Sequence, residues 1–146
     1  RGAPVVADVK MIAVGANAAR LAQLGSAVHT YIDEPDVIAR ARQGGTTRAV
    51  EAMRAAARAG LLHGGIAAVG NAPTALLEIV RLHQEEGVTP AFVVGMPVGF
   101  VNAAESKELL LQSGLPCVIT RGRKGGSTLT VAALHALLHI AAGDLR

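Results

Sequence analysis

Short continuous apolar runs alternate along the chain with longer stretches in which apolar residues recur every three or four positions. The runs predict buried strands and the longer stretches predict helices. This alternation predicts an α/β fold with three layers, in which a mostly parallel sheet carries helices on both faces. The expected strands are 5–7, 26–32, 66–69, 91–94 and 117–120, and the expected helices are 16–24, 37–43, 48–59, 74–84, 104–111 and 129–142, with a helical turn within 9–14.

The composition narrows the class of protein. The chain has 146 residues, half of them apolar, which is enough for a single domain over 1–146 with a real core. A net charge of +3 with only 2% aromatic residues argues against nucleic-acid binding, because stacking platforms are scarce. No apolar stretch is long enough for a membrane span. A single cysteine, Cys117, excludes an internal disulfide and fits a reducing, cytoplasmic location.

The chain is organised around residues 66–77, where a strand is followed by a turn and a helix. The apolar run ends at Gly70, Asn71 is expected to cap the following helix, and Pro73 fits its first turn. Such a helix start has exposed backbone N–H groups and a positive dipole end. It suits an anionic or carbonyl-bearing ligand.

Similar strand-to-turn passages occur at 95–101 and 121–127. Because ligands of open α/β sheets bind beyond the carboxyl ends of the strands, the three passages are expected to meet at one edge. Asp8 ends the first strand, and a cap is the more expected role there, with a ligand-facing acid as the alternative. Arg48 follows a threonine N-cap at residue 46 or 47, where a positive charge opposes the helix dipole. That hints at anion binding, with a solvated arginine as the equally weighted alternative.

The sequence lacks the common cofactor and catalytic motifs. Neither a dinucleotide fingerprint nor an ATP phosphate loop is present. His135 and His139 share a helix face, but without an HExxH motif and without a nearby cysteine or acid cluster a zinc site is not expected. The residues themselves therefore predict an anion-receptive, glycine-rich edge and do not name a reaction.

Three motifs together resemble the precorrin-8X methylmutase family, also known as cobalt-precorrin-8 methylmutase. They are GNAPTAL at 70–76, GMPVGFVNAAESK at 95–107 and RGRKGGS at 121–127, and the segment 2–11 and the Thr47-Arg48 pair match as well. The resemblance implies a cofactor-free, homodimeric isomerase of cobalamin biosynthesis, with alanine-rich helices available for the dimer interface. Its reaction would move a methyl group from C-11 to C-12 of precorrin-8X, giving hydrogenobyrinic acid or the cobalt form.

The resemblance also suggests site residues. Arg48 would bind a substrate carboxylate, and Arg121 and Arg123 would either meet acidic arms or make structural pairs. The remaining substrate-binding candidates are Asp8, Asn71, Ala72, Pro73, Thr74, Gly95, Met96 and Pro97. No catalytic residue is assigned, because the family's catalytic histidine lies in a segment before residue 1. An N-terminally shortened enzyme is therefore expected, and a non-catalytic corrinoid-binding module or inactive fragment is the alternative.

Overall fold

The computed structural model describes residues 2–144 and contains one fully parallel sheet with the strand order β2-β1-β3-β4-β5. Neighbouring strands are in register, so that Ala68 of the central strand pairs with both Ala7 and Val94. The strands are β1 (Val5–Ala7), β2 (Val28–His29), β3 (Ile66–Val69), β4 (Phe92–Gly95) and β5 (Cys117–Ile119).

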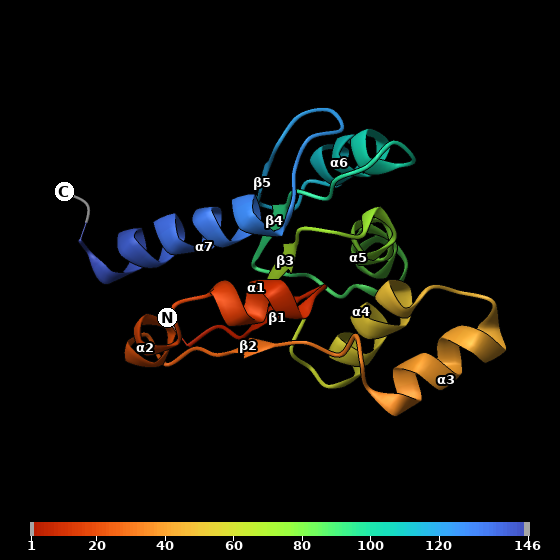
Figure 1. Ribbon diagram of the computed structural model, residues 1–146, viewed down its shortest axis with the longest axis horizontal. Coiled ribbons are helices and arrows are strands. Elements are labelled where there is room, and N and C mark those ends of the chain that lie inside the picture. The colour runs from red at the N-terminus through yellow and green to blue at the C-terminus, as the bar shows by residue number, and fades with distance from the viewer. Residues whose placement is uncertain (1, 145–146) are drawn as a thin grey trace.

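Helices cover both faces of the sheet, which confirms the expected three-layer α/β architecture (Figure 1). One layer holds the first and last helices, which pack against each other and against the sheet. The other holds the three helices that precede and follow β3 and β4, with α3 packed on the outside of α4. The helices are α1 (Lys10–Gly15), α2 (Ala18–Gln23), α3 (Pro35–Gly44), α4 (Arg48–Arg58), α5 (Pro73–Glu86), α6 (Ala103–Gln112) and α7 (Ser127–Ala142).

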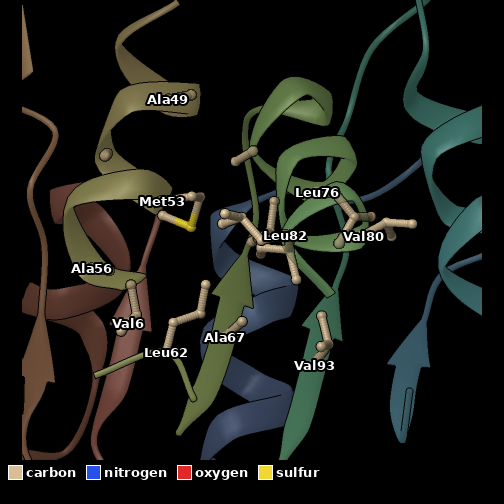
Figure 2. Packing of buried hydrophobic residues seen from close by; sticks show 14 of the residues in the cluster. Val6, Ala49, Met53, Ala56, Leu62, Ala67, Leu76, Val80, Leu82 and Val93 are labelled. Carbon is tan, nitrogen blue, oxygen red and sulfur yellow. The ribbon is translucent and has the colours of Figure 1, made fainter. Parts of the chain in front are cut away.

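The two faces of the sheet bury two apolar clusters, because successive residues of a strand point to opposite sides. Val6, Ala67 and Val93 lie beneath α4 and α5, as Figure 2 shows. Val5 and Ala68 lie on the opposite face with α1 and α7. Three alanines of α4 are buried in this packing, namely Ala49, Ala52 and Ala56. Two further alanines of that helix, Ala55 and Ala57, are partly buried against the same cluster.

Several expected boundaries differ from the structure, and three of the differences have a local physical reason. Only residues 28–29 of the expected strand 26–32 pair with β1, because this strand lies at the edge and has a single neighbour. Helix α3 begins at Pro35, whose missing N–H costs nothing in a first turn, so Asp36 is not its cap. Helix α7 begins at Ser127 with Gly126 in the cap position, so neither Ser127 nor Thr128 caps it. Within residues 2–144, the structure has no helix with the length and apolar character needed to cross a membrane.

Candidate functional site

The segments that follow β3, β4 and β5 lie side by side at the carboxyl edge of the sheet. Val69 pairs with Gly95, and Gly95 pairs with Ile119. Beyond the strands, the Met96 N–H donates to the Val69 carbonyl at 2.8 Å and the Gly126 N–H donates to the Met96 carbonyl at 2.8 Å. The outer two of these strands are two strand spacings apart, about 10 Å. The three passages therefore meet at one edge, as expected from the sequence.

Asp8 directly follows β1, the neighbour of β3 at this edge, and is completely buried. Its carboxylate accepts hydrogen bonds from the backbone N–H groups of Gly70, Asn71 and Ala72, at 3.0, 2.9 and 2.8 Å. Burial raises the pKa of Asp8, and these three donors oppose that rise. Asp8 is thus a cap that acts across the sheet, the more expected of its two roles, and its carboxylate has no exposed surface for a ligand.

The cap at Asp8 changes what the start of α5 can offer to a ligand. The N–H groups at 70–72, expected to be exposed, are already bound. Asn71 does not cap the helix, because Ala72 occupies the cap position and Pro73 the first turn. The Asn71 side chain is exposed, and Ala72, Pro73 and Thr74 are half-buried. A ligand at this corner would therefore meet side chains such as Asn71 and Thr74 and not a row of backbone donors.

Arg48 lies close to the same corner. Thr47 caps α4 by accepting from the Val50 N–H at 3.2 Å, and its hydroxyl also lies 3.1 Å from that of Thr74. This contact joins the starts of α4 and α5. The Arg48 side chain is 55% exposed and its guanidinium lies 3.6 Å from the Asp33 carboxylate. Arg48 is therefore accessible to an anion, although Asp33 partly balances its charge.

The segment Gly95–Pro97 supports the edge and does not offer side chains to a ligand. A Cβ at Gly95 would lie 2.8 Å from Leu110, and the Met96 side chain belongs to the core between the sheet, α1 and α7. Pro97 is buried as well. A Cβ at Gly125 would overlap the Met96 carbonyl oxygen and lie 2.7 Å from that of Pro97. Direct substrate contacts through these side chains are therefore not expected, because packing uses them.

The loop 120–126 carries the exposed positive charges of the edge. The Gly99 N–H donates to the Arg123 carbonyl at 3.2 Å, and the Arg123 guanidinium lies 5.3 Å from the centre of the Phe100 ring. This cation–π contact holds Arg123 over the neighbouring loop. Arg121 is exposed, and its side chain makes no hydrogen bond or salt bridge within residues 2–144. Both arginines can thus reach an anion placed over the edge.

Sequence reasoning missed Lys107, which is fully buried in α6 beneath this loop. Its ammonium donates to the Thr120 hydroxyl at 3.2 Å and to the carbonyls of Gly122 and Lys124 at 2.8 and 2.6 Å. Burial lowers the pKa of Lys107. The sequence did contain an indication of this burial, because Lys107 lies on the same helix face as Ala103 and Leu110, at the spacing of a buried stripe.

Comparison with known proteins identifies the family. Residues 1–140 match the family model described as CbiC, precorrin-8X methylmutase. The chain belongs to the precorrin-8X methylmutase family. It is 51% identical over 136 residues to the cobalt-precorrin-8 methylmutase of Priestia megaterium, covering 93% of this chain and 60% of the relative. It is 48% identical over 144 residues to that of Leptospira interrogans, covering 94% and 66% respectively.

A solved structure also resembles this member of the methylmutase family. The precorrin-8X methylmutase of Thermus thermophilus superposes with a TM-score of 0.88 at 48% identity, covering 98% of this chain and 69% of that one. The chain thus spans about two thirds of the length of that structure and 60–66% of the two curated relatives. The fold of that structure is shared over 98% of this chain.

Four of the five histidines of this family member contact polar groups of the chain itself. His63 accepts from the Thr89 N–H at 3.1 Å, and His83 lies 3.1 Å from the Thr89 hydroxyl, near the opposite edge of the sheet. His135 accepts from the Asn17 N–H, and His139 contacts Asp144. His29 lies within β2. Within residues 2–144, no group of three or more histidine, cysteine or acidic side chains is placed to hold a metal ion.

Proposed function

We propose that this chain forms the substrate-binding sheet of a precorrin-8X methylmutase, an isomerase of cobalamin biosynthesis. The reaction moves a methyl group from C-11 to C-12 of precorrin-8X and yields hydrogenobyrinic acid, or the cobalt-containing equivalent. The observation that carries the proposal is the gathering of the three motif segments at one edge of the sheet, with Arg121 and Arg123 exposed on the third segment. Arg48 lies at the start of α4, which contacts the start of α5 through Thr47 and Thr74. The family match over residues 1–140 supports it.

The chemistry fits a site of this kind. In the migration, one carbon–carbon bond breaks and one forms within the same molecule, so no co-reactant is consumed. The protein's task is then to hold and orient the macrocycle. Guanidinium groups bind carboxylates through paired, charge-assisted hydrogen bonds. A macrocycle with several carboxylates could bridge the width of about 10 Å between the passages after β3 and β5.

A titration with hydrogenobyrinic acid, followed by the visible spectrum, tests binding. Arg48→Ala should weaken it by about 1.5 kcal/mol, the lower part of the range for a hydrogen bond between charged groups, because Arg48 is half exposed and already near Asp33. Arg40→Ala, an exposed charge on α3, is the matched control and should leave the affinity unchanged. Equal affinities for both variants would remove Arg48 from the site.

An assay of methyl migration separates an enzyme from a binding module. The resemblance implies a catalytic histidine in a segment that precedes residue 1. The chain as it stands and the chain extended by that segment should therefore both bind the product, and the extended chain should convert substrate. Binding without turnover by both forms would favour a corrinoid-binding module, and absence of binding by both would contradict the proposal.

We further propose a homodimer, as the resemblance implies. Val14 and Phe100 are 86% and 85% exposed, and a dimer interface would cover apolar side chains of this kind. Sedimentation velocity should show a dimer, and a monomer at every concentration would contradict this proposal. A cytoplasmic location fits the lone Cys117, whose thiol forms no disulfide in the structure. Recovery of the protein in another cell fraction would contradict it.

A further inference from the structure

Lys107 is a buried cation whose donors are all used. The side chain has no exposed surface, and its three ammonium protons match three oxygen acceptors on residues 120, 122 and 124. The Thr120 hydroxyl in turn donates to the Lys124 carbonyl at 2.7 Å. Lys107 and Thr120 thus converge on one carbonyl and close the loop on itself.

The same loop is tied at its other side to the segment after β4. The Arg123 carbonyl accepts from Gly99, and the Gly126 N–H donates to Met96. Gly122 has a φ of +75°, a backbone conformation that lets its carbonyl turn inward toward Lys107. The carbonyls of Gly122 and Lys124 therefore face the buried Lys107, while the side chains of Arg121 and Arg123 are exposed.

The charge of Lys107 is not balanced by an acid. Among residues 2–144, no salt bridge joins Lys107 to a carboxylate, and its partners are only carbonyl and hydroxyl oxygens. The loop above it adds three more positive side chains, those of Arg121, Arg123 and Lys124. A buried cation without a counter-charge is costly unless another group compensates it. An anion bound over the loop would supply that compensation.

We propose that Lys107 is a positioning residue for substrate carboxylates, because its ammonium fixes the loop 120–126 in the shape that presents Arg121 and Arg123. The inference rests on the proposed function and concerns the part of the site that the loop 120–126 forms. Lys107 itself does not touch the ligand, since it is sealed beneath the loop. Its effect passes through loop shape and through the unbalanced positive charge below the bound anion.

Amide hydrogen exchange and ligand binding test the proposal with Lys107→Met, which keeps most of the length of the side chain and removes the ammonium. Exchange at residues 121–126 should become faster, and the affinity for hydrogenobyrinic acid should fall by about tenfold or more. The affinity for a corrinoid whose carboxylates are amides should fall less. Lys124→Met removes the same charge from the exposed surface of the loop, and it should leave the exchange rates unchanged.

Unchanged exchange in the loop of Lys107→Met would overturn the proposal, as would an equal loss of affinity for the acid and the amide. If that variant does not fold, Thr120→Val decides the matter, with Thr120→Ser as the control that keeps the hydroxyl. Faster exchange in the valine variant alone supports the tie, and identical behaviour of the two variants contradicts it. If the unmodified chain binds no corrinoid, the proposed function fails and the carboxylate role of Lys107 fails with it, while the exchange result still reports on the loop.

Discussion

The buried cap at Asp8 gives the sharpest test of how the candidate site is built. Asp8→Asn keeps the size of the side chain but replaces one carboxylate oxygen by an amide NH₂ group. In the unchanged protein, one carboxylate oxygen of Asp8 accepts from Gly70 and the other accepts from both Asn71 and Ala72. The asparagine keeps the most hydrogen bonds when its oxygen accepts from Asn71 and Ala72, and its NH₂ group then faces the Gly70 N–H.

The expected loss follows from these contacts. A hydrogen bond to a charged group contributes about 1.5–3 kcal/mol, so losing the Gly70 bond removes roughly that amount. The two remaining bonds lose the charge of their acceptor, which costs up to about 1 kcal/mol each. Burial of the carboxylate, which raises the pKa of Asp8, offsets part of this because the amide is easier to bury. The net decrease in the free energy of unfolding should be about 2–4 kcal/mol.

Urea unfolding followed by far-ultraviolet circular dichroism measures the loss, since the chain has no tryptophan to report on folding. Amide exchange should also become faster at residues 70–72, while the centre of the sheet stays protected until global unfolding. Asp36→Asn is the matched control, an exposed acid in the first turn of α3, and should change stability by no more than about 0.5 kcal/mol.

One result would refute this account of the corner. If Asp8→Asn unfolds within about 0.5 kcal/mol of Asp36→Asn and residues 70–72 exchange as before, the three hydrogen bonds do not hold the turn. The start of α5 would then be available to a ligand after all. In that case the side chains of Asn71 and Thr74 would lose their assigned place as the ligand contacts at this corner.

Two further predictions concern stability. The nearly buried Glu78 accepts from Arg54 and Arg81 at 2.8 and 2.6 Å; burial alone would raise its pKa, but these hydrogen bonds bring it below the ordinary 4.5. The ionised form of Glu78 therefore stabilises the fold above about pH 4.5, and this stabilisation is lost as the pH falls further. Glu78→Gln should lower the free energy of unfolding by about 3 kcal/mol at pH 7 and should make stability depend less on pH in the acid range. An unchanged acid dependence would contradict this role of Glu78. Gly125→Ala should lower the free energy of unfolding in urea by roughly 2 kcal/mol, because its Cβ would meet the backbone of Met96 and Pro97. Gly44→Ala, whose Cβ would lie 3.9 Å from the nearest atom of Thr46, should cost nothing. Equal stabilities of the two variants would show that the loop shifts freely.

The sequence predicted the layers of this fold well and its edges less well. Continuous apolar strands separated by amphipathic helices can be buried only in a parallel sheet that is covered on both faces. The expected strand 26–32 failed at its ends because pairing with a single neighbour is decided by the edge of the sheet and not by the alternation of side chains. The start of α7 failed for a related reason, since Gly126 takes the cap position through its hydrogen bond to Met96.

The candidate site shows the same division. The gathering of three passages at one edge follows from the order of strands and turns, and the sequence predicted it. The burial of Asp8 could not be predicted in this way, because its partners at residues 70–72 are more than 60 positions away. The inward turn of Gly95–Pro97 was hidden for a similar reason, since Leu110 and the loop 120–126 fill the space beside it.

By itself, the sequence determined the class of fold, the edge at which the three motif segments gather and, through its motifs, the family. These depend on hydrophobic period, turn residues and chain order, all of which are local. Only the tertiary structure decided which polar groups at that edge remain available. Hydrogen bonds across the sheet consumed the backbone donors of the central turn and the charge of Asp8, and buried Lys107 closed the arginine loop. Such pairings are set by distances in space, and a linear sequence does not contain them.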